Sequence, residues 1–430
     1  MKVELNYARE TMSCTVPDEN YLGTLLPEAP AAGLRGEAEV LRALEHPVGS
    51  RRLRELVRPG QKIALVTSDI TRPVPSSRIL PLVVEELRAG GVQDEDVTVV
   101  LALGSHRSHT EEEKRRLTGE QIYDSPVCVV DSDASDCVRL GVCRNGTPVD
   151  IFRRVAEADF RICIGNVEFH YFAGYSGGCK ALMPGVSSRE AIQANHSNMT
   201  RPGAHAGNLD GNPVRQDIDQ ITEFISVDFI VNVVLDDHKE IVRAETGHSI
   251  EAHREACAYL DRMYKIPLRE KADIVLFSPG GYPKDINLYQ AQKGLDNAGH
   301  AVKDGGILIW CASAREGFGE KTFEDWMLHK TPDEMIGEIR SHFKLGGHKA
   351  AAIAMVLKRA EIYFVSDLEK TLVEQMGMRH FDSLQQAVDE ALRAQRMNGI
   401  RPKVLVMPLA GSTLPAAETD RERVRQPEGD

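Results

Sequence analysis

"KIALVTSDITRPVPSSRILPLVVEELRAGGVQDEDVTVVLALG", residues 62–104, decides the fold class. Two apolar, β-branched runs, 62–67 and 97–104, are typical of buried strands. Between them apolar residues recur with the period of a helix, and the pair Gly90 and Gly91 ends it. A strand, a helix and another strand in this order are typical of a parallel sheet covered by helices. The stretch therefore predicts an α/β fold.

The same alternation continues along the chain and starts anew with a strand at 272–277. We therefore expect two domains, residues 1–268 and 269–410, each a mostly parallel sheet flanked by helices. Residues 411–430 are poor in apolar side chains, so we expect them to form a mobile tail.

Length and composition narrow the class of protein. A chain of 430 residues with 42% hydrophobic and 27% charged residues suits two soluble domains. The net charge of −12 argues against a nucleic-acid surface, which is normally basic. The start has no apolar signal segment and no run is long enough to cross a membrane, so we expect a cytoplasmic protein. The eight cysteines form no CxxC pair, which favours reduced thiols.

Polar side chains of the first domain follow its predicted strands, at the carboxyl ends where ligands bind in such sheets. They lie in "SDITRP" (68–73), "GSHRSHT" (104–110) and "HYFAGYSGGCKALMPG" (170–185), and they are Asp69, Arg72, His106, His170 and Lys180.

The second domain repeats the arrangement in "GGYPKDINLYQAQK" (280–293), with Tyr289, Gln290 and Lys293. Strand ends from both domains would then aim histidines and cations at one crevice.

Each of these residues also has a structural interpretation. Asp69 and Arg72 can pair around the turn at Pro73, and a lysine such as Lys293 on a helix usually faces water. We expect His109, which precedes a helix, at the surface and outside the site. Only the convergence of these residues at several strand ends therefore indicates a site.

Lys180 leaves several kinds of site open. The phosphate loop GxxxxGK[ST] is absent, because Lys180 follows Cys179 and precedes Ala181. A desolvated lysine can form a Schiff base, and a glycine loop can bind an anion through its backbone N–H groups. A zinc site would have to assemble from distant histidines. Cys179 could be a soft metal ligand, although a packed side chain is the simpler interpretation.

Taken in order, the four motifs, with "NH" at 195–196 after the third, resemble those of the nickel-dependent lactate racemase family. The resemblance runs from about residue 60 to 410. It implies two α/β domains with the active site in the interdomain cleft. It also implies a nickel-pincer cofactor, pyridinium-3,5-bisthiocarboxylic acid mononucleotide, bound covalently to Lys180, with His196 as a ligand of the nickel.

The resemblance also implies roles and a reaction. His106 and His170 would be the catalytic pair, Asp69 and Tyr289 would lie beside the cofactor, and the substrate would be held by Arg72, Gln290 and Lys293. The C2 hydride of a 2-hydroxy acid such as lactate would move reversibly to the pincer through a 2-keto acid, with one histidine for each enantiomer. Hydride transfer avoids a carbanion next to a carboxylate.

Other functions stay open. The substrate could be malate, a longer-chain or aromatic hydroxy acid, or a sugar acid such as gluconate. The protein could also be a cofactor-free anion-binding protein of the same fold, or a zinc hydrolase. The family resemblance further implies cofactor-biosynthesis enzymes as partners, and we expect no nucleic acid and no membrane.

Overall fold

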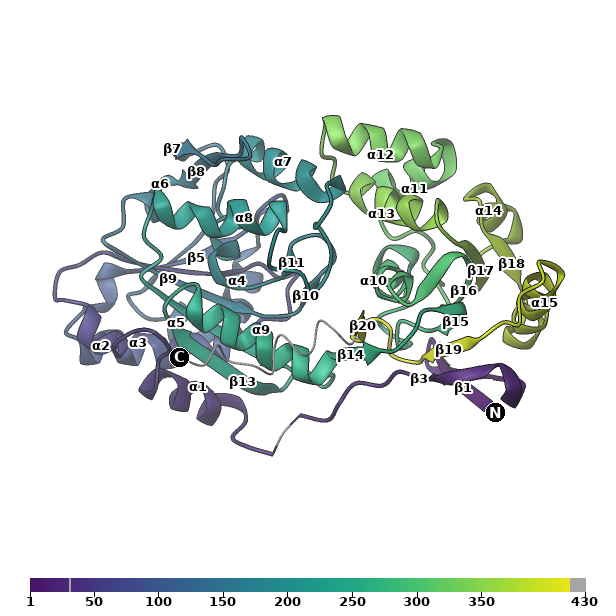
Figure 1. Cartoon of the computed structure of the whole chain (residues 1–430). Helices are drawn as coiled ribbons and strands as arrows, with labels where there is room; N and C mark the ends of the chain where they lie inside the picture. Colours follow the sequence, from purple (N-terminus) through teal and green to yellow (C-terminus); the bar gives the residue numbers. More distant parts are fainter. Residues whose placement is uncertain (31, 418–430) are drawn as a thin grey trace, which may run out of the picture. The chain divides into compact units, whose positions relative to one another are not determined.

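The chain forms two compact units in a computed structural model that describes residues 1–30 and 32–417 (Figure 1). One unit is the continuous stretch Pro30–Leu260, and the other joins Met1–Ala29 to the chain from Asp261 onward. Each contains a mostly parallel sheet with helices packed on it, so the predicted α/β fold with two such sheets is confirmed.

The unit of residues 30–260 is built on a sheet of six described strands in the order β13-β12-β9-β4-β5-β6. All neighbours are parallel except β12 and β13, which are antiparallel at one edge. The strands are β4 (Ile63–Ser68), β5 (Val97–Ala102), β6 (Cys128–Asp131), β9 (Phe160–Asn166), β12 (Phe229–Leu235) and β13 (Ile241–Gly247).

Helices and short hairpins complete this unit. The main core packs the sheet against α3 (Ser76–Ala89), whose buried Ile79, Leu80, Val83 and Leu87 recur at helical spacing. The further elements are α1 (Gly36–Glu45), α2 (Leu53–Leu56), α4 (Glu111–Thr118), α5 (Glu120–Tyr123), α6 (Arg153–Ala156), α7 (Arg189–Ser197), α8 (Pro213–Gln220), α9 (Glu251–Tyr264), and the strand pairs β7 (Cys137–Val142) with β8 (Pro148–Phe152) and β10 (Phe169–His170) with β11 (Gly174–Tyr175).

The strand order brings three loops together. From β4 the chain passes through α3 to β5 on one side, and β9 later pairs with β4 on its other side. Such a reversal is the usual place for a ligand in an open parallel sheet. The loops after β4, β5 and β9, which carry the first three motifs, therefore leave the sheet side by side.

The other unit has the sheet order β18-β17-β16-β15-β19-β3 among its described strands, with all neighbours parallel. The strands are β3 (Tyr21–Thr24), β15 (Ala272–Phe277), β16 (Val302–Cys311), β17 (Glu361–Val365), β18 (Arg379–Phe381) and β19 (Val404–Met407). The helices are α10 (Leu288–Gly299), α11 (Lys321–His329), α12 (Pro332–Ser341), α13 (Gly347–Leu357), α14 (Lys370–Gln375) and α15 (Leu384–Met397).

The start of the chain belongs to this second unit, in contrast to the expected domain 1–268. β1 (Lys2–Tyr7) and β2 (Glu10–Thr15) form a hairpin whose Val3 and Leu5 are buried in the core of the second sheet. β3 then pairs with β19. These pairings link segments almost 400 residues apart, which a local pattern does not reveal.

Part of the segment that we expected to be a mobile tail forms a strand. β20 (Leu414–Ala417) pairs in parallel with β14 (Lys265–Leu268), and Leu414 is buried. The prediction is therefore wrong for 414–417, where backbone pairing and a buried side chain hold the chain. Residues 418–430 lie outside the described part.

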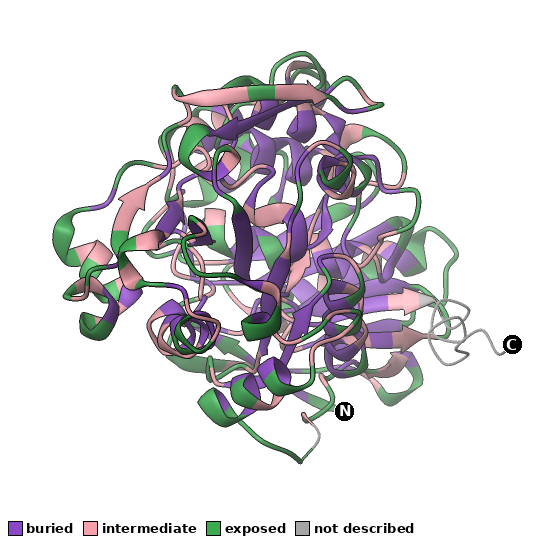
Figure 2. Cartoon of the chain, turned by 90° about the vertical axis from the view of Figure 1, so that its left-hand side faces the viewer, coloured by how far each residue is buried: buried purple, intermediate pink, exposed green. Residues whose placement is uncertain are grey.

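Burial follows the sheets (Figure 2). All seven residues of β9 are buried, as are the first five of β4, whereas exposed residues lie on the outer faces of helices. The eight cysteines are free thiols, as expected. Within the described residues no helix is long and apolar enough to cross a membrane. The cytoplasmic location stays a prediction.

Candidate active site

His106 and Asp69 form a hydrogen-bonded pair between the loops after β5 and β4. The His106 Nδ1 lies 2.6 Å from the Asp69 Oδ2, and Thr71 donates from its hydroxyl to the other carboxylate oxygen at 2.8 Å. Burial raises the pKa of Asp69, but the hydrogen bond and charge of His106 outweigh it and the pKa is lowered. Because a carboxylate oxygen accepts, the hydrogen of neutral His106 is on Nδ1, and its Nε2 carries a lone pair and no hydrogen.

His109 is buried, so the expectation of a surface residue is wrong. Its Nε2 accepts from the backbone N–H of Ile70 at 3.2 Å, and its Nδ1 lies 2.6 Å from an Asp131 carboxylate oxygen. A histidine two residues from a helix start gives no local sign of this burial. Asp131 ends β6, beside β5, and only that strand neighbour explains the contact.

The loop with Lys180 is held by glycines. Gly177 and Gly178 have φ values of 79° and 61°, in the left-handed region that favours glycine. A Cβ on Gly177 would meet the Asn232 side-chain oxygen at 2.7 Å, and one on Gly178 would meet the His253 ring at 2.9 Å. The same Asn232 oxygen accepts from the Gly178 N–H at 2.8 Å. This packing fixes the chain directly before Lys180.

The Lys180 amine is in an unusual environment. The side chain is half-buried in η3 (Gly178–Ala181), and burial together with the nearby charges of Arg72 and Arg215 holds its pKa well below its usual value, although Glu168 acts in the opposite direction. Arg215 is fully buried and donates to the backbone oxygens of Ala173 and Tyr175. Arg215 lies on α8 and was absent from our expected site, because no motif contains it.

His170 and His196 both contact the ring of Phe172. Phe172 contacts both edge-on, with ring centroids 4.5 Å from His170 and 5.0 Å from His196. The Ala173 backbone N–H donates to the His170 Nδ1 at 3.3 Å. A backbone N–H can only donate, so neutral His170 carries its hydrogen on Nε2, the opposite arrangement to His106.

Asn195 sets the tautomer of the buried His196. The Asn195 amide nitrogen donates to the Val214 backbone oxygen, so its side-chain oxygen faces the His196 Nδ1 at 3.2 Å. Nδ1 must therefore donate, and neutral His196 has no hydrogen on Nε2. A histidine oriented through one nitrogen in this way is typical of metal ligands. Among the described residues, no three His, Cys, Asp or Glu side chains are grouped to hold a metal ion.

Arg72 and Cys179 are two further residues of this unit that the sequence analysis considered. Arg72 is 3.9 Å from a Glu168 carboxylate oxygen and about one third of its side chain is exposed, so a guanidinium group remains near the loop of Lys180. Cys179 is fully buried and burial raises the pKa of its thiol to about 12. A neutral, packed thiol agrees with the structural interpretation of Cys179.

The fourth motif lies on α10 of the other unit. Gln290 and Lys293 are exposed and three residues apart, so they share one face of the helix. Tyr289 is half-buried, its ring edge-on to Phe323 at 5.5 Å, with the Lys349 ammonium 4.0 Å above it. The buried Lys349 was absent from our expected site.

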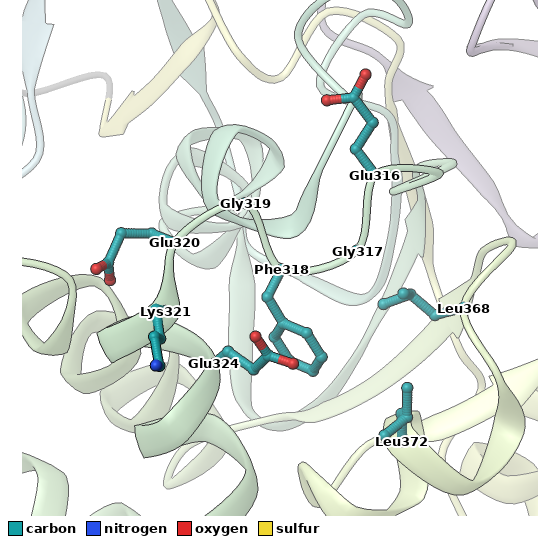
Figure 3. A pocket seen from close by; sticks show the side chains of 9 residues that line it. All are labelled: Glu316, Gly317, Phe318, Gly319, Glu320, Lys321, Glu324, Leu368 and Leu372. Atoms are coloured by element: carbon teal, nitrogen blue, oxygen red, sulfur yellow. The ribbon is translucent and has the colours of Figure 1, made fainter.

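A pocket of about 550 Å³ on this unit contains none of the expected site residues (Figure 3). Its polar lining includes Glu316, Glu320, Glu324 and Lys321. Three carboxylates against one ammonium disfavour an anionic ligand. Glu320 also caps α11 by accepting from the backbone N–H groups of Thr322 and Phe323. This pocket is therefore not the candidate site.

Fold and site together define an α/β protein with histidines and a lysine of lowered pKa in the loops after parallel strands. Comparison with protein-family models gives a match to the lactate racemase N-terminal domain over residues 7–207 and to the lactate racemase C-terminal domain over 268–412. The chain therefore belongs to the lactate racemase family.

Individual relatives agree with this assignment. The lactate racemase of Lactiplantibacillus plantarum is 34% identical over 418 residues, 94% of this chain and 97% of the relative. That of Thermoanaerobacterium thermosaccharolyticum is 36% identical over 346 residues, 79% of this chain and 81% of the relative.

Solved structures agree on the fold. The lactate racemase apoprotein from T. thermosaccharolyticum matches with a TM-score of 0.85 at 32% identity, covering 97% of this chain and 100% of that one. A Thermotoga maritima protein matches with a TM-score of 0.61 at 16% identity over 92% of this chain and 100% of that one, which speaks for the fold alone.

Proposed function

We propose that the protein is an isomerase that inverts the C2 carbinol of a 2-hydroxy acid, with lactate as the first substrate to test. Its family and the names of its relatives support the reaction class. The observation that carries the proposal is Lys180, a half-buried lysine of lowered pKa behind a glycine loop, with His170 in that loop.

The residues of the first unit fit a tethered nickel-pincer mononucleotide. A lysine of lowered pKa gives up its proton more readily than an exposed lysine, and the neutral amine is the form that can become acylated. His196 donates from Nδ1 to Asn195, so the lone pair of its neutral ring is on Nε2, the nitrogen that would bind a metal. Such a group, when bound, would accept and return the substrate hydride. The protein would then depend on the enzymes that make the cofactor.

The two histidines account for proton movement at the substrate hydroxyl. His106 accepts the hydroxyl proton at Nε2, and Asp69 stabilises the resulting imidazolium. In the same direction of the reaction, His170 donates a proton from Nε2 on the other face of the keto acid. It must therefore begin with both ring nitrogens protonated. Protonation of its Nδ1 gives up the 3.3 Å bond from the Ala173 backbone N–H. Turnover requires one of the two histidines to be neutral and the other to be protonated. The rate should therefore fall on both sides of an optimum pH.

The substrate carboxylate needs fixed cations, because a lost keto acid would end the cycle. We assign Arg72, Gln290 and Lys293 to this task, with Tyr289 and Asp69 beside the cofactor. Arg72 can bind a carboxylate through two N–H groups. These residues do not distinguish lactate from malate, longer-chain or aromatic hydroxy acids, or gluconate.

The test is to produce the protein together with pincer-synthesising enzymes and nickel. Intact mass and peptide mapping should show a mononucleotide-sized adduct on the Lys180 peptide, and a chiral assay should show interconversion of D- and L-lactate. Lys180→Arg should remove the adduct, because a guanidinium is a poor nucleophile. Lys303→Arg, at an exposed lysine paired with Asp273, is the matched control and should keep it.

The histidines are tested in the loaded protein. His106→Gln and His170→Gln should each lower kcat by roughly 100-fold or more while nickel content stays normal. Full activity in either variant would contradict the two-histidine assignment. An unmodified Lys180 in the wild-type protein would instead favour the anion-binding protein.

A further inference from the structure

Two loops of the candidate site are joined by a second histidine–carboxylate pair, His109 with Asp131. We propose that His109, oriented by Asp131, is a positioning residue. It holds the loop that carries Asp69 in the place where the Asp69 carboxylate meets His106. The inference deepens the proposed function, and its kinetic test rests on that function, whereas its structural test does not.

The hydrogen bonds of His109 allow one tautomer. The Ile70 backbone N–H can only donate, so the His109 Nε2 at 3.2 Å must be the acceptor. The hydrogen of the neutral ring is then on Nδ1, directed at an Asp131 oxygen 2.6 Å away. The second Asp131 oxygen accepts from the His109 backbone N–H at 3.0 Å. Asp131 thus fixes both the ring and the backbone of His109.

These bonds act on the neighbours of the reacting pair. Ile70 directly follows Asp69, so the bond to Nε2 holds the backbone from which the Asp69 carboxylate extends toward His106. Asp131 is the last residue of β6, which is paired with β5, so the pair is anchored to the sheet. The His109 side chain is 1% exposed, which leaves it little room to move.

His109 acts through these contacts and not on the substrate, because both ring nitrogens are already engaged within the protein. An error of about 1 Å in the placement of catalytic groups can cost on the order of 100-fold in rate. Loss of the Ile70 bond should therefore lower turnover more than substrate binding.

Two amide substitutions separate the bonds of His109. In His109→Gln the side-chain oxygen reaches the place of Nε2 and can still accept from Ile70. In His109→Asn the amide nitrogen takes the place of Nδ1, so the Asp131 bond is kept and the Ile70 bond is lost. In the loaded enzyme we expect His109→Asn to lower kcat by roughly 30-fold or more with KM within about 3-fold, and His109→Gln to lose less than about 5-fold.

The second readout needs no cofactor. The Nδ1 proton of His106, bonded to Asp69, should give a downfield proton NMR signal in the apoprotein that disappears in His106→Gln. It should persist in His109→Gln and be lost or broadened in His109→Asn, with both variants unfolding at similar temperatures. Persistence of the signal in His109→Asn would overturn the proposal, whether or not the wild type racemises anything.

A third variant covers the case in which His109→Asn does not fold. In Asp131→Asn the amide oxygen can take the His109 backbone N–H, which turns the NH₂ group toward Nδ1. The hydrogen of His109 must then move to Nε2, against the Ile70 N–H, and the His106 signal should again be lost. A retained signal with unchanged kcat would refute the positioning role.

Discussion

At the scale of single residues, Lys180 shows how environment changes the chemistry of a common side chain. The glycine loop buries part of it, and two guanidinium groups oppose its positive charge. An exposed lysine is protonated at neutral pH and is a poor nucleophile. The same neighbours that destabilise the ammonium form therefore favour the neutral amine, the form that the proposed attachment of the cofactor requires.

The protonated Lys180 should destabilise the folded apoprotein, and this effect can be measured. Its folded pKa lies below the value of 10.5 for an ordinary lysine, so the unfolded chain holds more protons between those two values. Lys180→Met should therefore raise the unfolding temperature at pH 7, and the gain should shrink as the pH approaches 10.5. Thermal melts over this pH range provide the measurement.

Lys62 offers a control of opposite sign. Its hydrogen bond to Asp96 raises the pKa of its exposed ammonium, so any stability it contributes is present below pH 10.5 and lost above. Lys62→Met should therefore not stabilise the protein at pH 7. A pH-independent effect of Lys180→Met would mean that the lysine is not destabilised in the folded state.

At the scale of elements, helix ends are set by a few neighbouring residues. Thr110 and Glu113 form a reciprocal capping box at the start of α4, and Thr331 and Glu334 do the same for α12. Gly90 ends α3 as its position suggested. These features depend on residues within one helical turn, which is why local reasoning succeeds.

The two capping boxes provide a matched pair of mutations. Thr110→Ala and Thr331→Ala should each cost about 1 kcal/mol of stability, measured by urea unfolding. Thr110 directly follows His109, so Thr110→Ala should also lower the racemisation rate of the loaded enzyme, by a factor of about 2 to 5. Thr331→Ala, in the other unit, should leave that rate unchanged. Equal rates in both variants would show that α4 does not hold the loop between β5 and α4, which carries His106, in its active position.

At the scale of the whole molecule, the two units differ in chain continuity. Pro30–Leu260 is one stretch with its own sheet and core, whereas the second unit needs the first 29 residues. Without them, β19 loses its neighbour β3 and the core loses Val3 and Leu5. An exposed strand edge and exposed apolar side chains favour aggregation.

This difference predicts the behaviour of fragments. Residues 30–264, which include all of α9, should fold alone, with cooperative thermal unfolding followed by circular dichroism. Residues 265–417 alone should aggregate or remain molten, and fusion of residues 1–29 to them through a short glycine-serine linker should restore cooperative unfolding. A cooperative 265–417 fragment without the first 29 residues would contradict the role of β1, β2 and β3.

The sequence by itself determined the strand, helix and strand of residues 62–104, the two-sheet α/β class and the motifs that point to the family, because these follow from the apolar pattern of short segments. It offered Arg72 as a structural partner of Asp69, whereas the structure pairs Asp69 with His106, and it placed His109 at the surface. Only the tertiary structure decided these points, together with the crossing of residues 1–29 to the second sheet. Strand order and register arise from pairing between distant segments, and that pairing has no local signature.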